Sequence, residues 1–402
     1  MVDLTAQTAE VRLQILLAQT TLGDEDTALA RQLIARIGDW EGFARSAQRN
    51  FSLPLMQRHV ARLDPPEIAP EIRMMMHQAA TQTALRNMKL VASQRQFLSR
   101  CLRPAGVPAI FFKGINLAAQ YYPDLGLRPS RDIDVLVPPG SLRRVVDQAL
   151  AEGYQLISPD TRMRAMTSPQ DIDAVLRLSG DVSLLAPEGT VFDLQQKLDK
   201  HSGIFPVADV FAEAETFALG GESFQTMAPA FLFNYLCHHH ARHTWSRLHW
   251  LSDLDAICAA PRFDPEATLA LADRLGQRGT VEAGLELRAL MSASAPWDNG
   301  PERARGKAFL DLAIRNLPGD LRLEKKISLP LKGGEFMFDW QARPELIARA
   351  RRNWWRSIFR PTLKQYVQMP LPRNRQWIYY IPRFFQLMQE TASRLALSGK
   401  TG

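Results

Sequence analysis

Two carboxylates at the start of an apolar segment are the residues of this sequence most suggestive of chemistry. Asp132 and Asp134 lie in the run Arg-Asp-Ile-Asp-Val-Leu-Val that ends at Val137. The β-branched and apolar residues predict a buried strand over 133–137, on which side chains two residues apart share one face. Adjacent buried negative charges are costly unless a cation offsets them, and Mg²⁺ prefers carboxylate oxygens. On this motif alone a second interpretation is equally open, with Asp132 capping a turn and Asp134 exposed.

A phosphate-binding turn is predicted just upstream. Residues 107–112, Val-Pro-Ala-Ile-Phe-Phe, are typical of a short buried strand, and Lys113 and Gly114 separate them from a segment, 115–122, with helical spacing. Such a turn directs free backbone N–H groups and the positive end of a helix at one point, where a phosphate can bind. Gly114 would allow close approach and Lys113 would add positive charge. Glycine at this kind of turn also has a purely conformational explanation.

A third carboxylate, Asp193, lies in the alternating segment Gly-Thr-Val-Phe-Asp-Leu-Gln at 189–195. Val191, Asp193 and Gln195 would share one face of a strand, and a neighbouring strand could bring Asp193 beside the first two carboxylates. Three carboxylates on adjacent strands can hold two metal ions for phosphoryl transfer. The alternative is a solvent-facing residue of an edge hairpin.

These segments resemble the uncharacterised nucleotidyltransferase family within the DNA polymerase beta superfamily. The similarity extends over roughly residues 75 to 260. Its first block comprises Lys113-Gly-Ile-Asn-Leu117, Tyr122-Pro123, Arg128, the run 131–137 and Gly153-Tyr154, and its second is the His-rich segment 239–253.

The resemblance implies an α+β fold, with a small mixed-sheet nucleotidyltransferase core flanked by N-terminal and C-terminal helical regions. It also implies a divalent metal, Mg²⁺ or Mn²⁺, and a nucleoside triphosphate such as ATP. Asp132 and Asp134 match the metal-binding pair and Asp193 the third carboxylate, so these three are the predicted catalytic residues. The wider superfamily usually has Gly-Ser after its first core strand, whereas this chain has Lys113-Gly114, the form usual for this particular family.

Histidines gather in the second block. Six of the eight in the chain fall between His201 and His249. We expect His239, Arg242 and His243 to face the active-site cleft, where they could contact phosphate or orient the acceptor. A structural role in an interdomain interface is as well supported. A zinc site at His239 and His243 would need a third ligand, which His238 and His240 cannot supply from other helix faces.

Three regions follow from the pattern of the chain. The pattern of residues 1–103 predicts an N-terminal helical region that ends in a long helix over 71–102. The pattern of residues 104–226 predicts the mixed core. Residues 227–402 predict a C-terminal helical region. Within the core we expect a helix over 142–151 capped by Ser141, and two β-rich segments with hairpin turns at 187–189 and 220–221.

Composition indicates a folded protein of ordinary apolar content, and we expect it to be cytoplasmic. The three cysteines, Cys101, Cys237 and Cys258, lack metal-type spacing and read as reduced core thiols. The first 23 residues do not resemble a signal peptide, and no run of about 18 apolar residues suggests a membrane span.

The basic excess is concentrated near the C-terminus. Residues 341–400 hold twelve Lys or Arg and two Asp or Glu, a net charge of +10, so the remainder of the chain carries −3 of the total of +7. Interleaved aromatic residues would suit nucleic acid or peripheral contact with an anionic membrane. We favour a helical layer packed on the core, because Pro361, Pro370, Pro372 and Pro382 interrupt any long amphipathic helix.

The resulting hypothesis is transfer of a nucleoside monophosphate from a triphosphate to a hydroxyl acceptor. The phosphates would lie near Lys113 and Gly114, and Arg128 and Arg131 could neutralise the leaving group. The acceptor stays open among small molecules, peptides and proteins, with nucleic acid ranked behind them. Two alternatives are an inactive nucleotide-binding scaffold and a nucleic-acid-binding protein that uses the basic tail.

Overall fold

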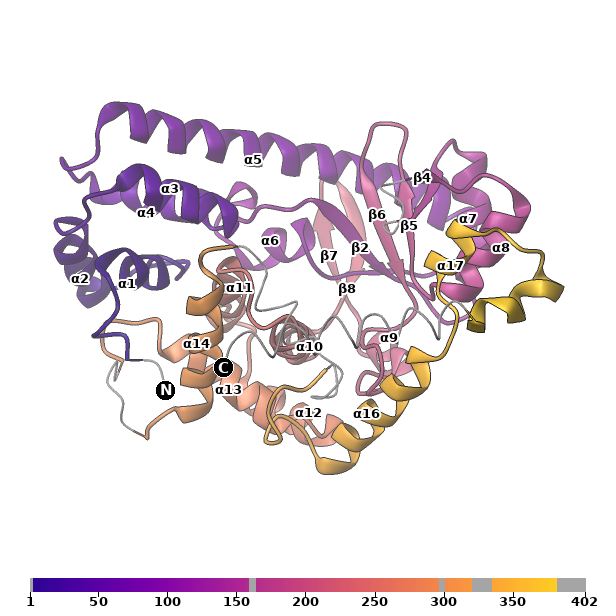
Figure 1. Ribbon diagram of the computed structural model, residues 1–402. Coiled ribbons are helices and arrows are strands. Elements are labelled where there is room, and N and C mark those ends of the chain that lie inside the picture. Colours follow the sequence, from indigo (N-terminus) through magenta and orange to yellow (C-terminus); the bar gives the residue numbers. More distant parts are fainter. Residues whose placement is uncertain (1–2, 159–163, 296–300, 320–334, 382–402) are drawn as a thin grey trace.

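The computed structural model describes residues 3–158, 164–295, 301–319 and 335–381. Its centre is a mixed sheet of eight strands in the order β4-β3-β5-β6-β2-β1-β8-β7 (Figure 1). The strands are β1 (Ile110–Phe111), β2 (Asp132–Leu136), β3 (Gln155–Ser158), β4 (Arg164–Ala165), β5 (Val182–Leu185), β6 (Val191–Gln195), β7 (Glu215–Leu219) and β8 (Glu222–Thr226). The pairs β2–β6 and β1–β8 are parallel and the other pairs are antiparallel. The predicted α+β fold is confirmed.

Helices precede the sheet in the chain, as predicted. They are α1 (Ala9–Leu16), α2 (Asp24–Ile34), α3 (Trp40–Arg49), α4 (Leu53–Leu63) and α5 (Pro70–Phe97), the last continued by a π-helical turn, Leu98–Leu102. Figure 1 shows α5 running along the top of the molecule from the N-terminal helices to the sheet. The long helix predicted over 71–102 is therefore confirmed, and its last turn widens before the chain turns back.

One face of the sheet is covered by the C-terminal part of α5 and by α7 (Leu142–Ala151). Ile133 and Val135 of β2 and Phe192 of β6 point to this side and are fully buried. The ring of Phe97 stacks on that of Phe192 with centroids 4.3 Å apart. Because side chains alternate along a strand, burial of these residues forces their polar neighbours to the opposite face.

The opposite face meets a helical layer. It contains α6 (Ile115–Tyr121), α10 (Pro229–Arg242) and α11 (His249–Cys258), with α12 (Pro265–Leu275), α13 (Arg278–Ala289) and α14 (Ala304–Asn316) packed behind them. Phe112, which follows β1, contacts the ring of Tyr235 on α10 edge to face, with centroids 5.3 Å apart. The polar face of β2 and β6 is thus enclosed between the sheet and α10.

Smaller expectations are mostly confirmed. The predicted hairpins are β5–β6 and β7–β8, and Gly189, Gly220 and Gly221 have positive φ in their turns. Helix α7 has the predicted bounds, but the Ser141 side chain makes no capping hydrogen bond, so that detail was wrong. Helices α8 (Pro169–Leu178) and α9 (Val207–Ala212) were not predicted.

The basic C-terminal segment forms α16 (Pro344–Ile358), α17 (Leu363–Gln368) and a 3₁₀ turn, Arg373–Tyr379. Tyr366 and Tyr379 are buried, and the Tyr366 hydroxyl donates to Asp171 of α8 at 2.8 Å. Trp355 and Trp377 are instead more than half exposed. The expected packing on the core therefore holds for part of the aromatic set, and Pro382, Phe384 and Phe385 lie outside the described residues. None of the described helices is long and apolar enough to cross a bilayer.

A buried ion pair joins the core to the helical layer beside it. Arg128, on the segment leading into β2, donates from Nε and Nη2 to the two carboxylate oxygens of Asp253 on α11 at 2.7 and 2.8 Å. The Tyr122 hydroxyl donates to the same carboxylate at 2.7 Å, and both charged side chains are almost fully buried. Such a forked pair is geometrically specific, so it fixes how the two segments meet.

Replacing Asp253 by Ala should lower the free energy of unfolding by about 3–5 kcal/mol, because Arg128 would stay buried without a counter-charge. Replacing both partners with apolar residues (Arg128→Met with Asp253→Leu) should recover much of the loss. Urea denaturation measures both effects. The matched control is Asp147→Ala, which breaks the exposed pair with Arg143 and should cost less than about 1 kcal/mol.

Candidate active site

Three carboxylates meet on the face of the sheet that points to the helical layer. In the parallel pairing of β2 and β6, Asp134 lies directly opposite Asp193, and Asp132 lies opposite Val191. Asp132 is two residues before Asp134 and therefore points to the same side. The predicted convergence of Asp132, Asp134 and Asp193 is confirmed as geometry, and neither the turn-cap interpretation nor the edge-hairpin interpretation holds.

Polar side chains contact two of these carboxylates, Asp134 and Asp193. The Lys113 ammonium lies 2.7 Å from Asp134 Oδ1, and Gln195 Nε2 donates to the same oxygen at 3.0 Å. Asp193 Oδ1 accepts a hydrogen bond from the Ser183 hydroxyl at 2.5 Å. Asp132 has no ion-pair partner among the described residues. One lysine therefore faces three carboxylates, and the cluster keeps an excess of negative charge.

The pKa values of these side chains reflect the excess of negative charge in the cluster. Burial, reinforced by the charges of Asp134 and Asp193, raises the pKa of Asp132 to about 6. The pKa of Asp193 is raised by burial and by Asp134, against the hydrogen bond from Ser183. Burial disfavours the charged form of Lys113, but Asp134 outweighs it and keeps the lysine pKa above its ordinary value. A cation bound here would be favoured by the carboxylates and would lower their pKa values.

Gly114 forms the predicted turn between β1 and α6. Its backbone has φ +59° and ψ −130°, which essentially only glycine adopts. A Cβ at this position would lie 3.3 Å from the carbonyl oxygen of Asp132. The turn therefore packs closely against the start of β2, beside the first carboxylate.

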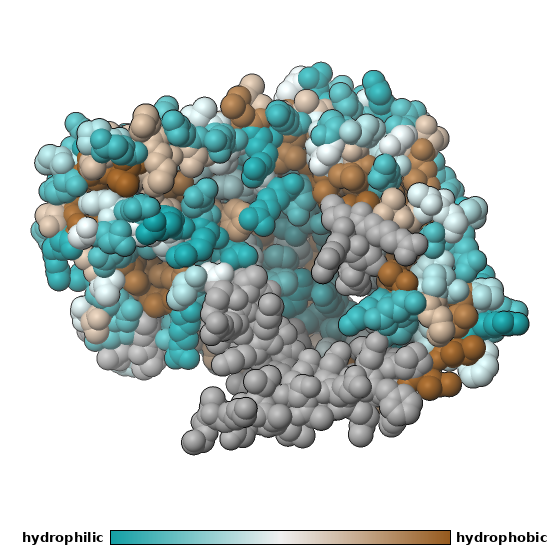
Figure 2. All heavy atoms as spheres, turned by 45° about the horizontal axis from the view of Figure 1, so that its top comes forward, coloured by the Kyte–Doolittle hydropathy of each residue, from teal (hydrophilic) through white to brown (hydrophobic). Residues whose placement is uncertain are grey.

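A cavity of about 540 Å³ brings most of the predicted site residues together. Among the residues named from the sequence it is lined by Lys113, Gly114, Arg128, Arg131, Asp132, Asp134, Asp193, His239 and His243. Arg242 does not line it and reaches it only through His243, whose Nε2 lies 3.2 Å from Arg242 Nη2. Figure 2 shows that this side of the molecule is hollowed near its middle, with mainly hydrophilic atoms in its depth.

The two predicted arginines have different surroundings. The Arg128 guanidinium forms an ion pair with Asp253. It therefore adds positive charge at a fixed position and does not reorient to contact a ligand. Arg131 is exposed, and its guanidinium carbon lies 4.2 Å from the centre of the Phe51 ring. Arg247 lies 5.3 Å from the same ring. Two guanidinium groups thus pack against the Phe51 ring beside the cavity.

Phe51 is the most informative lining residue that the sequence analysis missed. It follows α3, far from the core in sequence, and its φ of +59° is unusual for a bulky residue. Backbone strain of this kind often accompanies functional sites. Apart from that, the sequence holds no signal for it, since the contact depends on packing between distant segments. Ser130, Gln195, Ser246, Arg247, His249 and Trp250 were also missed as lining residues.

The histidine-rich segment forms a buried polar layer behind the cavity. The His239 and His243 rings lie 4.8 Å apart, and the His240 ring stacks on Trp250 at 4.6 Å. His238 points elsewhere, against Phe205 and Phe336. Burial, with neighbouring cations, holds the pKa values of His239 and His240 well below the ordinary range. These rings are therefore neutral at pH 7, which suits hydrogen bonding rather than ionic contact with phosphate.

The described residues contain no group of three His, Cys, Asp or Glu side chains already arranged as metal ligands. No zinc site is formed by His239 and His243 in that part of the chain. The three aspartates nonetheless fit a divalent ion chemically: they supply hard oxygen donors on one face, and their charge exceeds that of Lys113. Binding would require the Asp134 carboxylate to exchange its contact with Lys113 for one with the ion.

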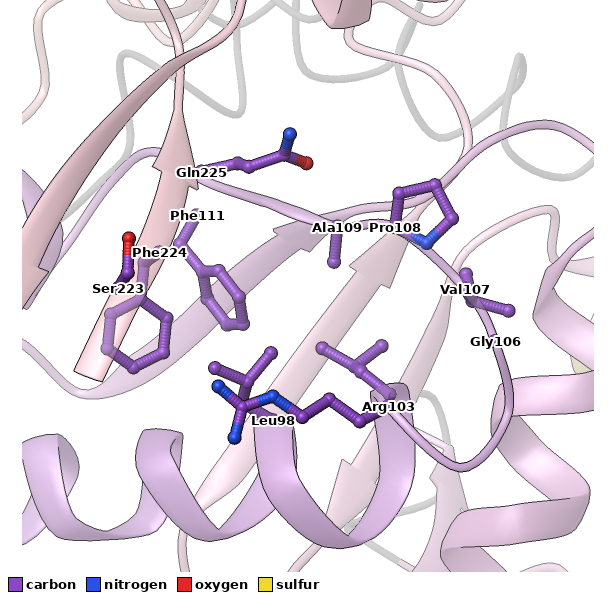
Figure 3. A pocket seen from close by; sticks show the side chains of 11 residues that line it. Leu98, Arg103, Gly106, Val107, Pro108, Ala109, Phe111, Ser223, Phe224 and Gln225 are labelled. Carbon is purple, nitrogen blue, oxygen red and sulfur yellow. The ribbon is translucent and has the colours of Figure 1, made fainter.

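A separate cavity of about 310 Å³ lies on the other side of β1, between the π-helical turn and β8 (Figure 3). Val107, Ala109, Phe111 and Phe224 contribute to its lining, and Arg103 beside it is paired with Glu222 at 2.7 Å. No residue predicted to act in the site lines this cavity. The chemistry-bearing side chains are therefore confined to the face toward α10.

A family model described as an uncharacterised nucleotidyltransferase matches residues 38–292, and the chain belongs to this family. The match includes Phe51, β2, β6 and the histidine-rich segment. No curated protein matches the chain.

Acidification should destabilise the protein through its buried histidines. Burial lowers the pKa of His249 to about 3, so the unfolded chain takes up a proton below about pH 6.5 while the folded chain does not. The contribution of His249 to stability should therefore fall by about 2 kcal/mol between pH 7 and 5, whereas Asp132, with its raised pKa, acts in the opposite direction.

Urea denaturation of the wild type and of His249→Asn across this range tests the effect. Asparagine can keep the contact that His249 Nδ1 makes with the Asn50 carbonyl, and the variant should show a shallower loss of stability. The control is His77→Asn at an exposed position, which should leave the slope unchanged. An unchanged slope in His249→Asn would contradict the assignment.

Proposed function

We propose that this protein is a metal-dependent nucleotidyltransferase that transfers a nucleoside monophosphate from a nucleoside triphosphate to a hydroxyl acceptor. The observation that carries the proposal is the pairing of Asp134 with Asp193, with Asp132 on the same face, in a cavity that also contains Gly114 and Lys113. Family membership supports nucleotidyl transfer as the general reaction.

Asp132, Asp134 and Asp193 would hold Mg²⁺ or Mn²⁺. When bound, such ions would neutralise phosphate charge and make an acceptor hydroxyl a better nucleophile. The acceptor oxygen forms a bond to the α-phosphorus, and the bond from that phosphorus to the bridging oxygen breaks. Pyrophosphate leaves with the electron pair, and the hydroxyl proton passes to water.

The protein's own groups bind and orient the triphosphate. Gly114 lines the cavity just before the start of α6, and it presents backbone rather than a side chain to a phosphate bound there. Lys113 is charged and only 14% exposed, and it can turn from Asp134 to a phosphate oxygen. Arg131 and Arg247 add positive charge at the Phe51 side of the cavity. His239, which is neutral, and His243 can orient the acceptor by hydrogen bonding.

Nucleotide transfer should be abolished by Asp134→Asn, with a fall in rate of at least about 10³-fold, because a group that stabilises transition-state charge is lost while the side-chain shape is kept. The measurement is incorporation of label from α-³²P-labelled triphosphates into a cell extract, followed by identification of the labelled species. Chelation of divalent ions should abolish labelling, and added Mg²⁺ or Mn²⁺ should restore it.

The matched control for that experiment is Asp147→Asn, an exposed carboxylate on α7, which should label like the wild type. Retained transfer in Asp134→Asn, with the fold intact by circular dichroism, would remove the assignment. Nucleotide binding without transfer by the wild-type protein would favour the inactive scaffold instead.

Loss of the Phe51 ring should weaken triphosphate binding. Without it Arg131 and Arg247 lose a shared contact worth about 0.5–1 kcal/mol each, so we expect KM for the triphosphate to rise roughly five- to thirtyfold in Phe51→Ala with kcat little changed. Phe51→Tyr keeps the ring and should behave like the wild type. Phe359→Ala removes an exposed aromatic ring elsewhere and controls for non-specific effects. An unchanged KM in Phe51→Ala would refute this role.

A further inference from the structure

A cavity of about 800 Å³ lies beyond the carboxyl ends of β2 and β6. Pro138 and Pro139 follow β2, residues 196–203 follow β6, and the remaining walls come from Pro108, from Phe205 and Pro206 before α9, and from α9 and α16. The volume is in the range of small-molecule sites in proteins. The triphosphate site already described does not include these residues.

This second cavity adjoins the acidic one. The consecutive residues Gln195 and Gln196 line the first and the second cavity respectively. Arg242 links them as well: it contacts His243 in the first, and together with burial and Lys200 it lowers the pKa of His201 in the second, against the opposing charge of Glu335. A molecule in the second cavity would therefore lie just beyond the end of β6, where the Gln195 side chain contacts Asp134 at 3.0 Å.

Cations outnumber acids in the lining of the second cavity, where Asp199 is the acid among the described lining residues. Lys197, Lys200 and Arg349 line it, and neither they nor Arg242 forms an ion pair with any described carboxylate. Elsewhere in the described structure many arginines do form ion pairs, mostly at exposed positions, as Arg143 and Arg278 do. An excess of positive charge at a concave surface attracts anions.

Nearby carboxylates are engaged by backbone instead. Glu335 accepts hydrogen bonds from the backbone N–H groups of Lys200, His201 and Ser202 at 2.5, 2.7 and 2.7 Å. Asp199 accepts from Gly203 and Phe205 at 2.6 and 3.2 Å. These two acids shape the loop after β6 and form no ion pair with its lysines, although Asp181 and Glu335 offset part of the charge of Lys200 at longer range.

The opposite wall is apolar, with Phe205, Val207 and Phe211 among its residues. Helix α16 closes the cavity from the basic C-terminal segment: Arg349 Nη2 donates to the Gly203 carbonyl at 3.2 Å and Asn353 Nδ2 to the His201 carbonyl at 2.9 Å. Part of the basic excess noticed in the sequence is thus built into a cavity wall. A ligand matching both walls would have an anionic group and an apolar part.

We propose that this cavity is the acceptor site, and that the acceptor is a small molecule in which a phosphate or carboxylate group accompanies an apolar moiety and the hydroxyl that is nucleotidylated. The inference rests on the proposed nucleotidyl transfer. Lys200 and Arg349 bind the anionic group, and the apolar wall packs against the rest of the molecule. The cavity directs the hydroxyl across Gln195 toward the carboxylates.

Calorimetry with phenyl phosphate, benzoate and the neutral benzyl alcohol tests the site without nucleotide or metal. The full-length protein should bind at least one of the two anions, and the stronger of them identifies the group recognised. Benzyl alcohol should show no binding at about 10 mM. The double variant Lys200→Gln with Arg349→Gln should weaken anion binding by at least about tenfold. The control double variant Arg352→Gln with Lys364→Gln removes the same charge from exposed positions and should bind like the wild type.

Equal anion binding by the wild type and the cavity variant would overturn the proposal, as would binding of benzyl alcohol as strong as that of the anions. So would displacement of the anion by the Mg²⁺–ATP complex, which would place it in the nucleotide site, or by a short single-stranded RNA. Affinity for Mg²⁺–ATP should be unchanged in the cavity variant. Failure of the transfer reaction itself would appear in the Asp134→Asn labelling experiment and would leave anion binding intact, so the two failures are distinguishable.

Discussion

The parallel pairing of β2 with β6 is the constraint on which the rest of the structure depends. Its register places Asp134 opposite Asp193, and strand alternation adds Asp132 to the same face. A shift of one residue would turn Asp193 toward Phe97 and bury a charge in the apolar layer under α5. Apolar packing of Ile133, Val135 and Phe192 on one side therefore determines where the acids stand on the other.

Strand alternation is local, and for that reason the acidic face could be predicted from the sequence. The spacing of Asp132, Asp134 and Asp193, the glycine turn after β1 and both hairpins needed only period-two patterning and turn chemistry. The order of the strands was beyond this reasoning, since β1 lies between β2 and β8 through pairings of distant segments. The positions of Phe51 and Arg247 also depend on how whole helices pack. Arg128 shows the opposite case: its position was anticipated, but only tertiary structure reveals that Asp253 engages its guanidinium.

The charge of the chain is divided between two adjoining cavities. Acids dominate the face of β2 and β6, and unpaired cations dominate the loop after β6 and one face of α16. A negative cavity beside a positive one suits a reaction that needs metal ions in the first cavity and an anionic substrate in the second. Tyr366 and Tyr379 contribute by anchoring the segment after α16 to the protein. The basic C-terminal segment is thereby a part of the folded structure up to residue 381, rather than only a surface for polyanions.

The acidic cluster is electrostatically unfavourable on its own, which is an argument for its use. Burial raises the pKa of Asp132 to about 6, and the charges of Asp134 and Asp193 add to this effect by more than Lys113 offsets. A fold that needed only a stable strand at this place would be better served by one acid, or by none. A bound cation removes the repulsion and releases Lys113 toward phosphate. The same imbalance that weakens the metal-free protein therefore favours the arrival of a metal–triphosphate complex.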